Sequence, residues 1–524
     1  TATPFTNTNV AVGFEALRGS TTASENTGLH NTALGYQTLL NNTTGQQNTA
    51  TGMNGLYANT TGSLNTANGM NSLIANTTGN YNSVLGAYSL NANVTGTSNV
   101  AVGTNALATN VAGNNATAIG TNAMYYANNT VTPFTNTNVA VGFEALRGSV
   151  TASANTGLQN TAIGYQSLSN NTTGYANTFG GYQSGYNNTA GDDNTFFGRQ
   201  SGFTNINGNN NSFFGATAGY NNTDGDLNTF VGYGSGSINS TGSYNSFLGG
   251  YSGRFNSTGT RNVAFGYESL YTNSTGDDNC ALGHAALNFA TGSQNTAVGS
   301  FSMESTTTGQ YNTAMGYQSL QTNGGGSFNT SIGRGSLALT TSGNFNTALG
   351  YAAGNGFNNG SSNTFIGYNS DASAASYSNA TALGNGAVVT ASNRVRIGNT
   401  AVTQIGGEVG WSTLSDGRYK KNIQASSLGL SFILKLNPVT YNLTDKGQEA
   451  ITYTGLVAQD VEKILKECNA GFNAITKPEN ETDRYAIRYA EFVMPLINAV
   501  KEQQKQIDEL KALINKMKDN GGLK

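Results

Sequence analysis

The short run Ser415-Asp-Gly-Arg-Tyr-Lys420 places a hydroxyl, a carboxylate and an amine within six residues. A serine hydroxyl needs a base to become a nucleophile, and a lysine amine can serve once burial lowers its pKa enough to keep it neutral. A turn across the five-residue spacing could return the amine to the hydroxyl. Taken alone, however, Ser415-Asp416-Gly417 is typical of an ordinary turn, in which Lys420 is a solvated charge.

A repeated signature occupies most of the chain before this run. The pattern Asn-(Thr/Ser/Val)-(Ala/Phe)-(apolar)-Gly recurs from Asn9 to about residue 384, mostly with a period of 17. Three repeats are longer, at 22 residues, and Thr3–Ser20 reappears as Thr132–Ser149. A fixed short period over so many copies predicts stacked coils and not a globular enzyme. No insertion larger than five residues interrupts the period, so a polysaccharide-degrading site with paired carboxylates is not indicated.

The copy that begins at Asn160 illustrates one expected coil. Its first segment is short and rich in β-formers, and alternation separates Thr161 and Ile163 from Ala162. Because other copies have two apolar residues at the outer positions of this triplet, we expect those positions to face the core. The central Ala or Phe would then pack against a neighbouring chain.

A second apolar anchor follows in each of several copies, and the Asn-Thr-Thr-Gly stretches are typical of turns. Two short strands and two turns in 17 residues predict one coil of a parallel β-solenoid, or β-roll, in a mainly β protein. So narrow a roll has a thin core, and we expect it to need lateral association to bury enough apolar surface. The anchor residues are Leu39, Leu90, Leu168, Leu270 and Leu320.

Acidic pairs in the repeats are the candidates for a metal site. Asp192-Asp193 and Asp277-Asp278 fall just before the repeated asparagine at matching phases. Stacked carboxylates of this kind could hold Ca²⁺. Solvated turn charges explain the same residues more simply, so we expect neither a metal nor a cofactor. Exposed tyrosines after the repeat glycine could stack on sugars, although packing or an interface role is the simpler interpretation.

Charge divides the chain into two modules. Only 21 of the 51 charged side chains (24 Lys+Arg and 27 Asp+Glu) lie in residues 1–410, and the first lysine is Lys420. The net charge of −3 predicts no general attraction to nucleic acid or to anionic membranes. No apolar run approaches the roughly 20 residues needed to span a bilayer, so we expect no membrane insertion. The printed chain begins at Thr1 without a methionine, as a fragment or a processed product would.

The C-terminal module has a different pattern, and we expect a neck at 385–414 between residues 1–384 and 415–524. A short helix is predicted at Leu428–Leu436, a strand at Val439–Leu443, a helix at Ala458–Cys468 and a strand at Tyr485–Tyr489. Near the end, apolar positions step by four and three, which predicts a short coiled coil over about 496–518 in a parallel oligomer. An amphipathic helix folded onto its own domain is the alternative. The seam residues are Leu496, Val500, Gln503, Ile507, Leu510, Ile514 and Met517.

The repeats resemble those in the heads of trimeric autotransporter adhesins, whose similar coils build a β-roll in a trimer. The usual coil here is longer than the common adhesin coil. The chain also shows no counterpart of the C-terminal region that anchors those adhesins, so we expect a fibre that is not self-anchored.

Three blocks resemble the self-cleaving intramolecular chaperone domain of phage tailspikes and tail fibres. They are Leu414-Ser-Asp-Gly-Arg-Tyr-Lys-Lys-Asn-Ile423, Gly455-Leu-Val-Ala-Gln-Asp-Val-Glu462, and Tyr485-Ala-Ile-Arg-Tyr-Ala-Glu-Phe492 with the following Leu496–Val500. Tyr419 stands where the family often has an aliphatic residue. The order of the blocks and their coverage of nearly all of 411–524 make chance agreement improbable.

The resemblance implies a site and a function. Ser415 would be the nucleophile, Lys420 the base, and Asp416 either an orienting group or a turn cap. We place the cut at Leu414–Ser415, and the sequence does not fix which side of Ser415 breaks. We therefore expect a phage tail-fibre-like homotrimer, in a virion or at a cell surface, that binds a host receptor such as a glycan. A bacterial surface adhesin with the same folding module is the alternative. Activity in trans is not expected, because the Ser/Lys pair lies beside its own scissile bond.

Overall fold

The computed structural model describes residues 7–444, 450–481, 483–519 and 521. The chain forms two compact units, unit 1 at Thr1–Asn359 and unit 2 at Gly360–Lys524. The first four residues of the duplicated segment Thr3–Ser20 lie outside the described residues.

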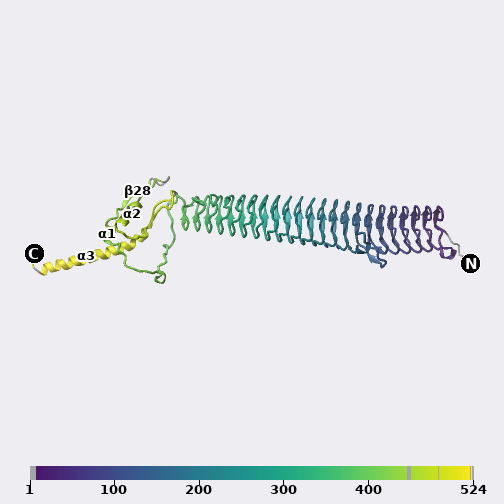
Figure 1. The fold of residues 1–524 in the computed structure, drawn as a ribbon, viewed down its shortest axis with the longest axis horizontal. Coiled ribbons are helices and arrows are strands. Elements are labelled where there is room, and N and C mark those ends of the chain that lie inside the picture. The colour runs from purple at the N-terminus through teal and green to yellow at the C-terminus, as the bar shows by residue number, and fades with distance from the viewer. Residues whose placement is uncertain (1–6, 445–449, 482, 520, 522–524) are drawn as a thin grey trace. The chain divides into compact units, whose positions relative to one another are not determined.

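Unit 1 is a stack of coils, each contributing one three-residue strand to a parallel sheet (Figure 1). Each strand pairs in register with the strand of the next coil, so Thr161 lies beside Thr178 and Ala162 beside Phe179. The parallel β-solenoid predicted from the period is therefore confirmed. The strands are β1 (Val10–Val12), β2 (Thr32–Leu34), β3 (Thr49–Thr51), β4 (Thr66–Asn68), β5 (Ser83–Leu85), β6 (Val100–Val102), β8 (Thr117–Ile119), β10 (Val139–Val141), β11 (Thr161–Ile163), β12 (Thr178–Gly180), β13 (Thr195–Phe197), β14 (Ser212–Phe214), β15 (Thr229–Val231), β16 (Ser246–Leu248), β17 (Val263–Phe265), β18 (Cys280–Leu282), β19 (Thr296–Val298), β20 (Thr313–Met315), β21 (Thr330–Ile332) and β22 (Thr347–Leu349).

The prediction of which strand face points inward was wrong. Ala162 is fully buried, whereas Ile163 is 49% exposed. The reason is that Asn160 is buried among hydrogen-bond partners, and strand alternation puts Ala162 on the same side as Asn160. The outer positions of the triplet, which include Ile163, must then face away from the core.

The prediction of two strands per coil was also wrong for most coils. The second segment of each coil is a chain of turns, in which residues such as Gln166 and Leu168 have positive φ of 52° and 53°. Alternating left-handed residues coil the backbone too tightly for an extended strand. Among the described residues, short second strands pair only at β7 (Gly113–Asn114) with β9 (Phe134–Thr135) and at β24 (Asp371–Ala372) with β26 (Val388–Val389). The predicted anchor role of the leucines is confirmed, because Leu168 and its equivalents are fully buried.

Two ladders of buried asparagines run through the stack. In the first ladder, the side-chain oxygen of Asn194 accepts from the backbone N–H of Asn211 at 2.9 Å, and its side-chain nitrogen donates to the Gly208 carbonyl at 2.8 Å. In the second, Asn205 donates to the side-chain oxygen of Asn188 at 2.7 Å and to Gly208 at 3.0 Å. Each coil therefore satisfies buried polar groups of its neighbours.

A stack of phenylalanines replaces the usual alanine in five consecutive coils. The rings of Phe179, Phe196 and the next three members lie parallel, with centroids 4.4–5.0 Å apart. In these coils the anchor leucine is replaced by glycine, and a Cβ on Gly202 would fall inside contact distance of the Phe196 ring. Coils therefore fill their interiors in different ways, with Ala and Leu in many of them and with Phe and Gly in these five.

The longer coils contain extra short turns. Single 3₁₀ turns occur at η1 (Ala23–Glu25) and η2 (Ala152–Ala154), and the side-chain oxygens of Asn26 and Asn155 close the two loops at Ser20 and Ser149. The same closure at equivalent positions agrees with the duplication read from the sequence.

Unit 2 begins with further coils, which we call the terminal coils. They hold the parallel strands β23 (Thr364–Ile366), β25 (Thr381–Leu383) and β27 (Val395–Ile397), besides β24 and β26. Residues 401–427 follow as an almost entirely exposed segment that contains the 3₁₀ turn η3 (Gly417–Tyr419).

The residues after this segment fold around one small apolar core. The elements are α1 (Leu430–Ile433), the antiparallel pair β28 (Val439–Asn442) and β29 (Thr452–Gly455), α2 (Ala458–Glu467), the pair β30 (Ile475–Thr476) and β31 (Ala486–Ile487), η4 (Tyr489–Phe492) and α3 (Val493–Asp519). The elements predicted for this region are confirmed, with α1 and β31 shorter than expected. The core is built from Leu428, Phe432, Val461, Leu465, Ala474 and Phe492.

Candidate active site and assembly surfaces

Ser415 and Lys420 lie together at the turn η3. The ammonium Nζ of Lys420 donates to the hydroxyl Oγ of Ser415 at 2.7 Å. The turn folds the chain back over five residues, which is the geometry that the spacing allowed. The structure thus brings the two groups into hydrogen-bond contact, as a nucleophile and its base require.

Asp416 serves as the cap of this turn. Its carboxylate accepts from the backbone N–H of Arg418 at 2.9 Å and forms an ion pair with the Arg418 side chain at 2.6 Å. These hydrogen bonds from Arg418 lower the pKa of Asp416 below its ordinary value. Of the two roles considered for Asp416, the turn cap is the one its contacts support. Its contribution to catalysis stays a prediction.

The whole site is open to solvent in the single chain. Ser415 and Lys420 are exposed, and Leu414, whose carbonyl begins the expected scissile bond, is 98% exposed. Apolar residues nearby are also uncovered, with Trp411 and Tyr419 each 88% exposed. An exposed amine is stabilised in its charged form by water, so the chemistry calls for something that covers this segment.

The aspartates considered for Ca²⁺ have other partners. Asp192 accepts from the backbone N–H of Tyr175 at 2.8 Å, and Asp277 accepts from the N–H of Thr260 at 2.7 Å. Asp278 forms an ion pair with Arg261, whose hydrogen bonds lower the pKa of that carboxyl.

Asp193 occupies a corner of its coil with a φ of 54°. Over residues 7–444, 450–481, 483–519 and 521, no group of three or more His, Cys, Asp or Glu side chains is placed to hold a metal ion.

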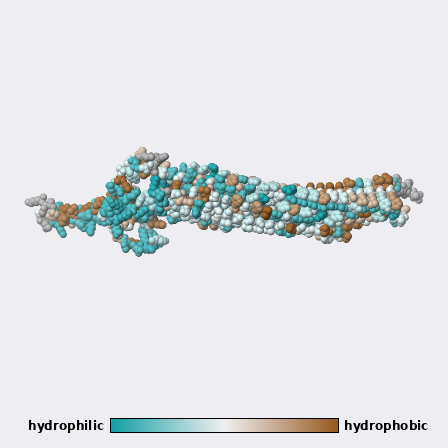
Figure 2. Space-filling view, turned by 45° about the horizontal axis from the view of Figure 1, so that its top comes forward, coloured by the Kyte–Doolittle hydropathy of each residue, from teal (hydrophilic) through white to brown (hydrophobic). Residues whose placement is uncertain are grey.

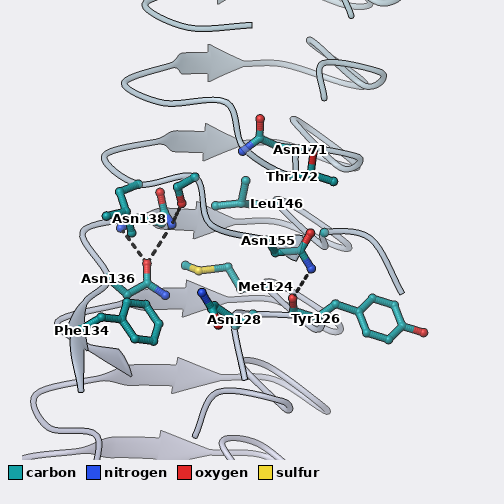
Figure 3. Close-up of a pocket in the computed structure, with 14 residues that line it drawn as sticks. Met124, Tyr126, Asn128, Phe134, Asn136, Asn138, Leu146, Asn155, Asn171 and Thr172 are labelled. Atoms are coloured by element: carbon teal, nitrogen blue, oxygen red, sulfur yellow. Dashed lines mark hydrogen bonds between the residues drawn. The ribbon is translucent and has the colours of Figure 1, made fainter. Parts of the chain in front are cut away.

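A small cavity lined by apolar residues and asparagines lies inside unit 1 where two long coils meet (Figure 3). Its volume is about 30 Å³, which is room for roughly one water molecule. Asn136, Asn138 and Asn155 line it, and the side-chain oxygen of Asn136 accepts from the Asn138 side chain at 2.8 Å. The cavity is too small for an organic ligand.

Unit 1 carries an apolar face made by the outward strand residue and the aromatic residue that follows the repeat glycine. We call it the strand face. Ile163 and Phe265 on it are 49% and 57% exposed, and Tyr165 stacks on Tyr182 with centroids 5.2 Å apart. Figure 2 shows hydrophobic residues in a row along part of the coil stack. Uncovered apolar rows of this kind mark interaction surfaces.

Helix α3 presents a second apolar row. Of the predicted heptad seam, Val500 is 64% exposed and Leu510 is 58% exposed, while the buried residues of α3 are Pro495 and Ala499. The other side of α3 holds α1, because the Glu502 carboxylate accepts from the Leu430 N–H at 2.8 Å. The seam is therefore free to pack on another helix.

None of the helices in the described part of the chain has the length and apolar character needed to span a bilayer.

One polar cluster was missed by the sequence reasoning. Arg394 on the terminal coils contacts Asp483 and Glu479 in the loop between β30 and β31. The available signal was weak: Arg394 and Arg396 stand close together in a module that is otherwise poor in charge.

Comparison with protein families shows that residues 415–469 match the family described as chaperone of endosialidase. No curated protein matches the chain. The matched segment begins at Ser415 and runs through α2, so it covers the candidate site and much of the small core. The chain is thus a parallel β-solenoid followed by a chaperone domain of this kind, as in a tailspike or fibre.

Proposed function

We propose that this protein is one chain of a trimeric attachment fibre of the phage tail-fibre type, whose C-terminal domain (residues 415–524) directs assembly and is then released by self-cleavage. The match to chaperone of endosialidase implies trimeric assembly and suggests a phage tail fibre. The observation that carries the cleavage is the contact of Lys420 Nζ with Ser415 Oγ at 2.7 Å, at the first residue of the matched segment.

Cleavage at this site needs only the chain and water. A neutral Lys420 amine accepts the hydroxyl proton of Ser415 while the oxygen attacks the Leu414 carbonyl carbon. The Leu414–Ser415 C–N bond breaks, the freed amine takes up a proton, and water then hydrolyses the resulting ester. Each chain is cut once, by its own Ser415 and Lys420.

Trimer formation supplies the missing burial. In the single chain the site is exposed, and burial of a lysine amine favours the neutral form that the reaction needs. The strand face of unit 1 and the α3 seam are apolar rows that a second and third copy would cover. If association also covers residues 401–427, cleavage occurs only after the three chains have aligned correctly.

Mass measurement tests the proposal. The wild-type chain of 54.3 kDa is expected to give a C-terminal fragment of roughly 12 kDa, at about 110 Da per residue, and an N-terminal fragment with the remaining mass. Ser415→Ala should give a full-length chain that still forms trimers. Lys420→Gln should also block the cut, whereas the neighbouring Ser412→Ala control should be cut like wild type. A Ser415→Ala chain that is cut as fast as wild type would refute the mechanism.

A second candidate is a bacterial surface adhesin that uses the same folding module, because its repeats resemble adhesin heads. A secretion or sorting segment in the full gene would favour the adhesin, and a baseplate-binding segment would favour the phage. Binding of the purified trimer to surface glycans or to whole cells would test attachment in either case. Mixing cleaved domain with a Ser415→Ala fibre tests trans activity, and no cut is expected.

A further inference from the structure

The loop between β30 and β31 makes polar contacts with the terminal coils. The Asp483 carboxylate accepts from Arg394 Nη1 at 2.7 Å and from the Thr390 hydroxyl at 3.0 Å. Asn480 donates to the Tyr377 hydroxyl at 2.8 Å and to the Thr390 carbonyl at 3.0 Å. We call this set of contacts the latch.

The latch is well formed at its centre. The Asp483 side chain is only 5% exposed, and it also accepts from the backbone N–H groups of Glu479 and Arg484 at 3.2 and 3.0 Å. Burial alone would raise the pKa of Asp483, but the hydrogen bonds, led by that from Arg394, outweigh burial and lower it. A second acid, Glu479, reaches Arg394 at 3.0 Å. A buried carboxylate with this many donors is a specific contact and not a chance surface pair.

The latch crosses the expected cut. Tyr377, Thr390 and Arg394 precede the Leu414–Ser415 bond, whereas Asn480 and Asp483 follow it. The covalent route between the two sides is the exposed segment 401–427. Breaking one peptide bond in that segment removes none of the latch contacts.

We propose that the latch keeps the severed C-terminal domain bound to the terminal coils, so that cutting and release are separate steps. The idea rests on the proposed self-cleavage for its biological setting, while the contacts themselves do not depend on which reaction makes the cut. Release then requires the Arg394–Asp483 pair to open and both groups to regain water, which makes release slower than the cut and faster at high salt.

An engineered cut tests the latch without relying on self-cleavage. A recognition sequence for a site-specific protease is inserted between Gln404 and Val409 in the full-length Ser415→Ala chain, in the exposed segment. After digestion, gel filtration shows whether the C-terminal fragment stays with the N-terminal fragment. When the latch residues are unchanged, the two fragments should co-elute at low salt and should separate faster as the salt concentration rises.

Latch variants in the same background supply the decisive comparison. Asp483→Asn or Arg394→Gln should speed fragment release at least about tenfold, because each removes the charged contact between Arg394 and Asp483, and Arg394→Gln also leaves the buried Asp483 carboxylate without its cation. Glu481→Gln in the same loop is the matched control and should leave release unchanged. Each variant must first show the uncut trimer mass and Tm of its parent.

The proposal is overturned if the chain with the wild-type latch releases its fragment at once, as fast as Asp483→Asn does. It is equally overturned if both latch variants hold the fragment as long as the wild-type latch does, since interlocked subunits would then hold it. An uncut wild-type chain would instead refute self-cleavage, and it would leave the result of the engineered cut in force.

Discussion

The interior of the coil stack combines apolar side chains with uncharged polar ones in similar measure, whereas the C-terminal domain has a small apolar core under a charged surface. In unit 1, Asn194 and its equivalents are fully buried and bonded from coil to coil. In the C-terminal domain, Phe432, Val461 and Phe492 form the core, while the seam residues of α3 lie outside it. The two regions therefore satisfy their buried groups by different means.

This difference separates what a single chain can do for itself from what it needs a partner to do. Each coil forms its hydrogen bonds and packing with the coils directly before and after it. The free energy of unfolding of unit 1 is therefore approximately a sum over single coils and over the interfaces between adjacent coils. The C-terminal domain leaves exposed the α3 seam and the segment 401–427 that carries Ser415. These are the surfaces that the proposed trimer would cover.

The largest expected effect tests how the residues inside one coil fill its interior, at the Phe196–Gly202 pair in the coil of β13. Phe196→Ala should cost about 3–5 kcal/mol of unfolding free energy through the cavity it leaves, and Gly202→Leu should cost a few kcal/mol by overfilling the coil. The double variant should be more stable than Phe196→Ala alone, because Ala162 and Leu168 already form such a pair in another coil, with Leu168 at a φ of 53°. Thermal unfolding measures all three, and strictly additive losses would contradict the pairing.

The next effect tests the dependence of the C-terminal domain on partners. Leu510→Asp should remove the trimer or weaken it by about 1.5–3 kcal/mol per chain, since a leucine loses its buried place in the seam. Sedimentation velocity at several concentrations measures the oligomer. Lys511→Glu, one residue off the seam, is the control. A Leu510→Asp trimer as tight as the parent would mean that the seam is not an interface.

The asparagine ladder should show an intermediate loss. Asn194→Ala leaves the buried Asn211 N–H without its acceptor and removes one of the two side-chain donors to the Gly208 carbonyl, which should cost about 1–3 kcal/mol. Asn207→Ala, which removes an exposed amide from the same face of turns, should change stability by less than about 0.5 kcal/mol. Equal losses for the two variants in chemical denaturation would show that burial of the ladder does not matter.

The smallest effect concerns acid stability of the C-terminal domain. Hydrogen bonds from Lys477, Lys466 and Tyr485 lower the pKa of Glu462 to about 2. A carboxyl whose pKa is lower when folded stabilises the domain above its ordinary pKa, and that contribution fades as the pH falls toward 2. Glu462→Gln should therefore lower Tm at pH 7 and leave it nearly unchanged at pH 2. A Tm loss that is the same at both pH values would argue against this role.

The candidate site could be found from the sequence only through the resemblance of three ordered blocks. Ser415 and Lys420 alone were compatible with a turn and a solvated charge, and the hydrogen bond between them is a result of the turn η3. The latch was beyond prediction because Arg394 and Asp483 lie 89 positions apart and share no motif.

The sequence by itself determined the period, and through it the stacked coils, the positions of the strands and the buried leucines such as Leu168. Strand alternation also determined that Ala162 and Ile163 point to opposite sides. Only the tertiary structure decided which side is inside, because that depends on Asn160 finding buried partners in the next coil and on the ring or leucine that fills the same interior. Alternation divides a strand into two faces, and the neighbours across the coil choose between them.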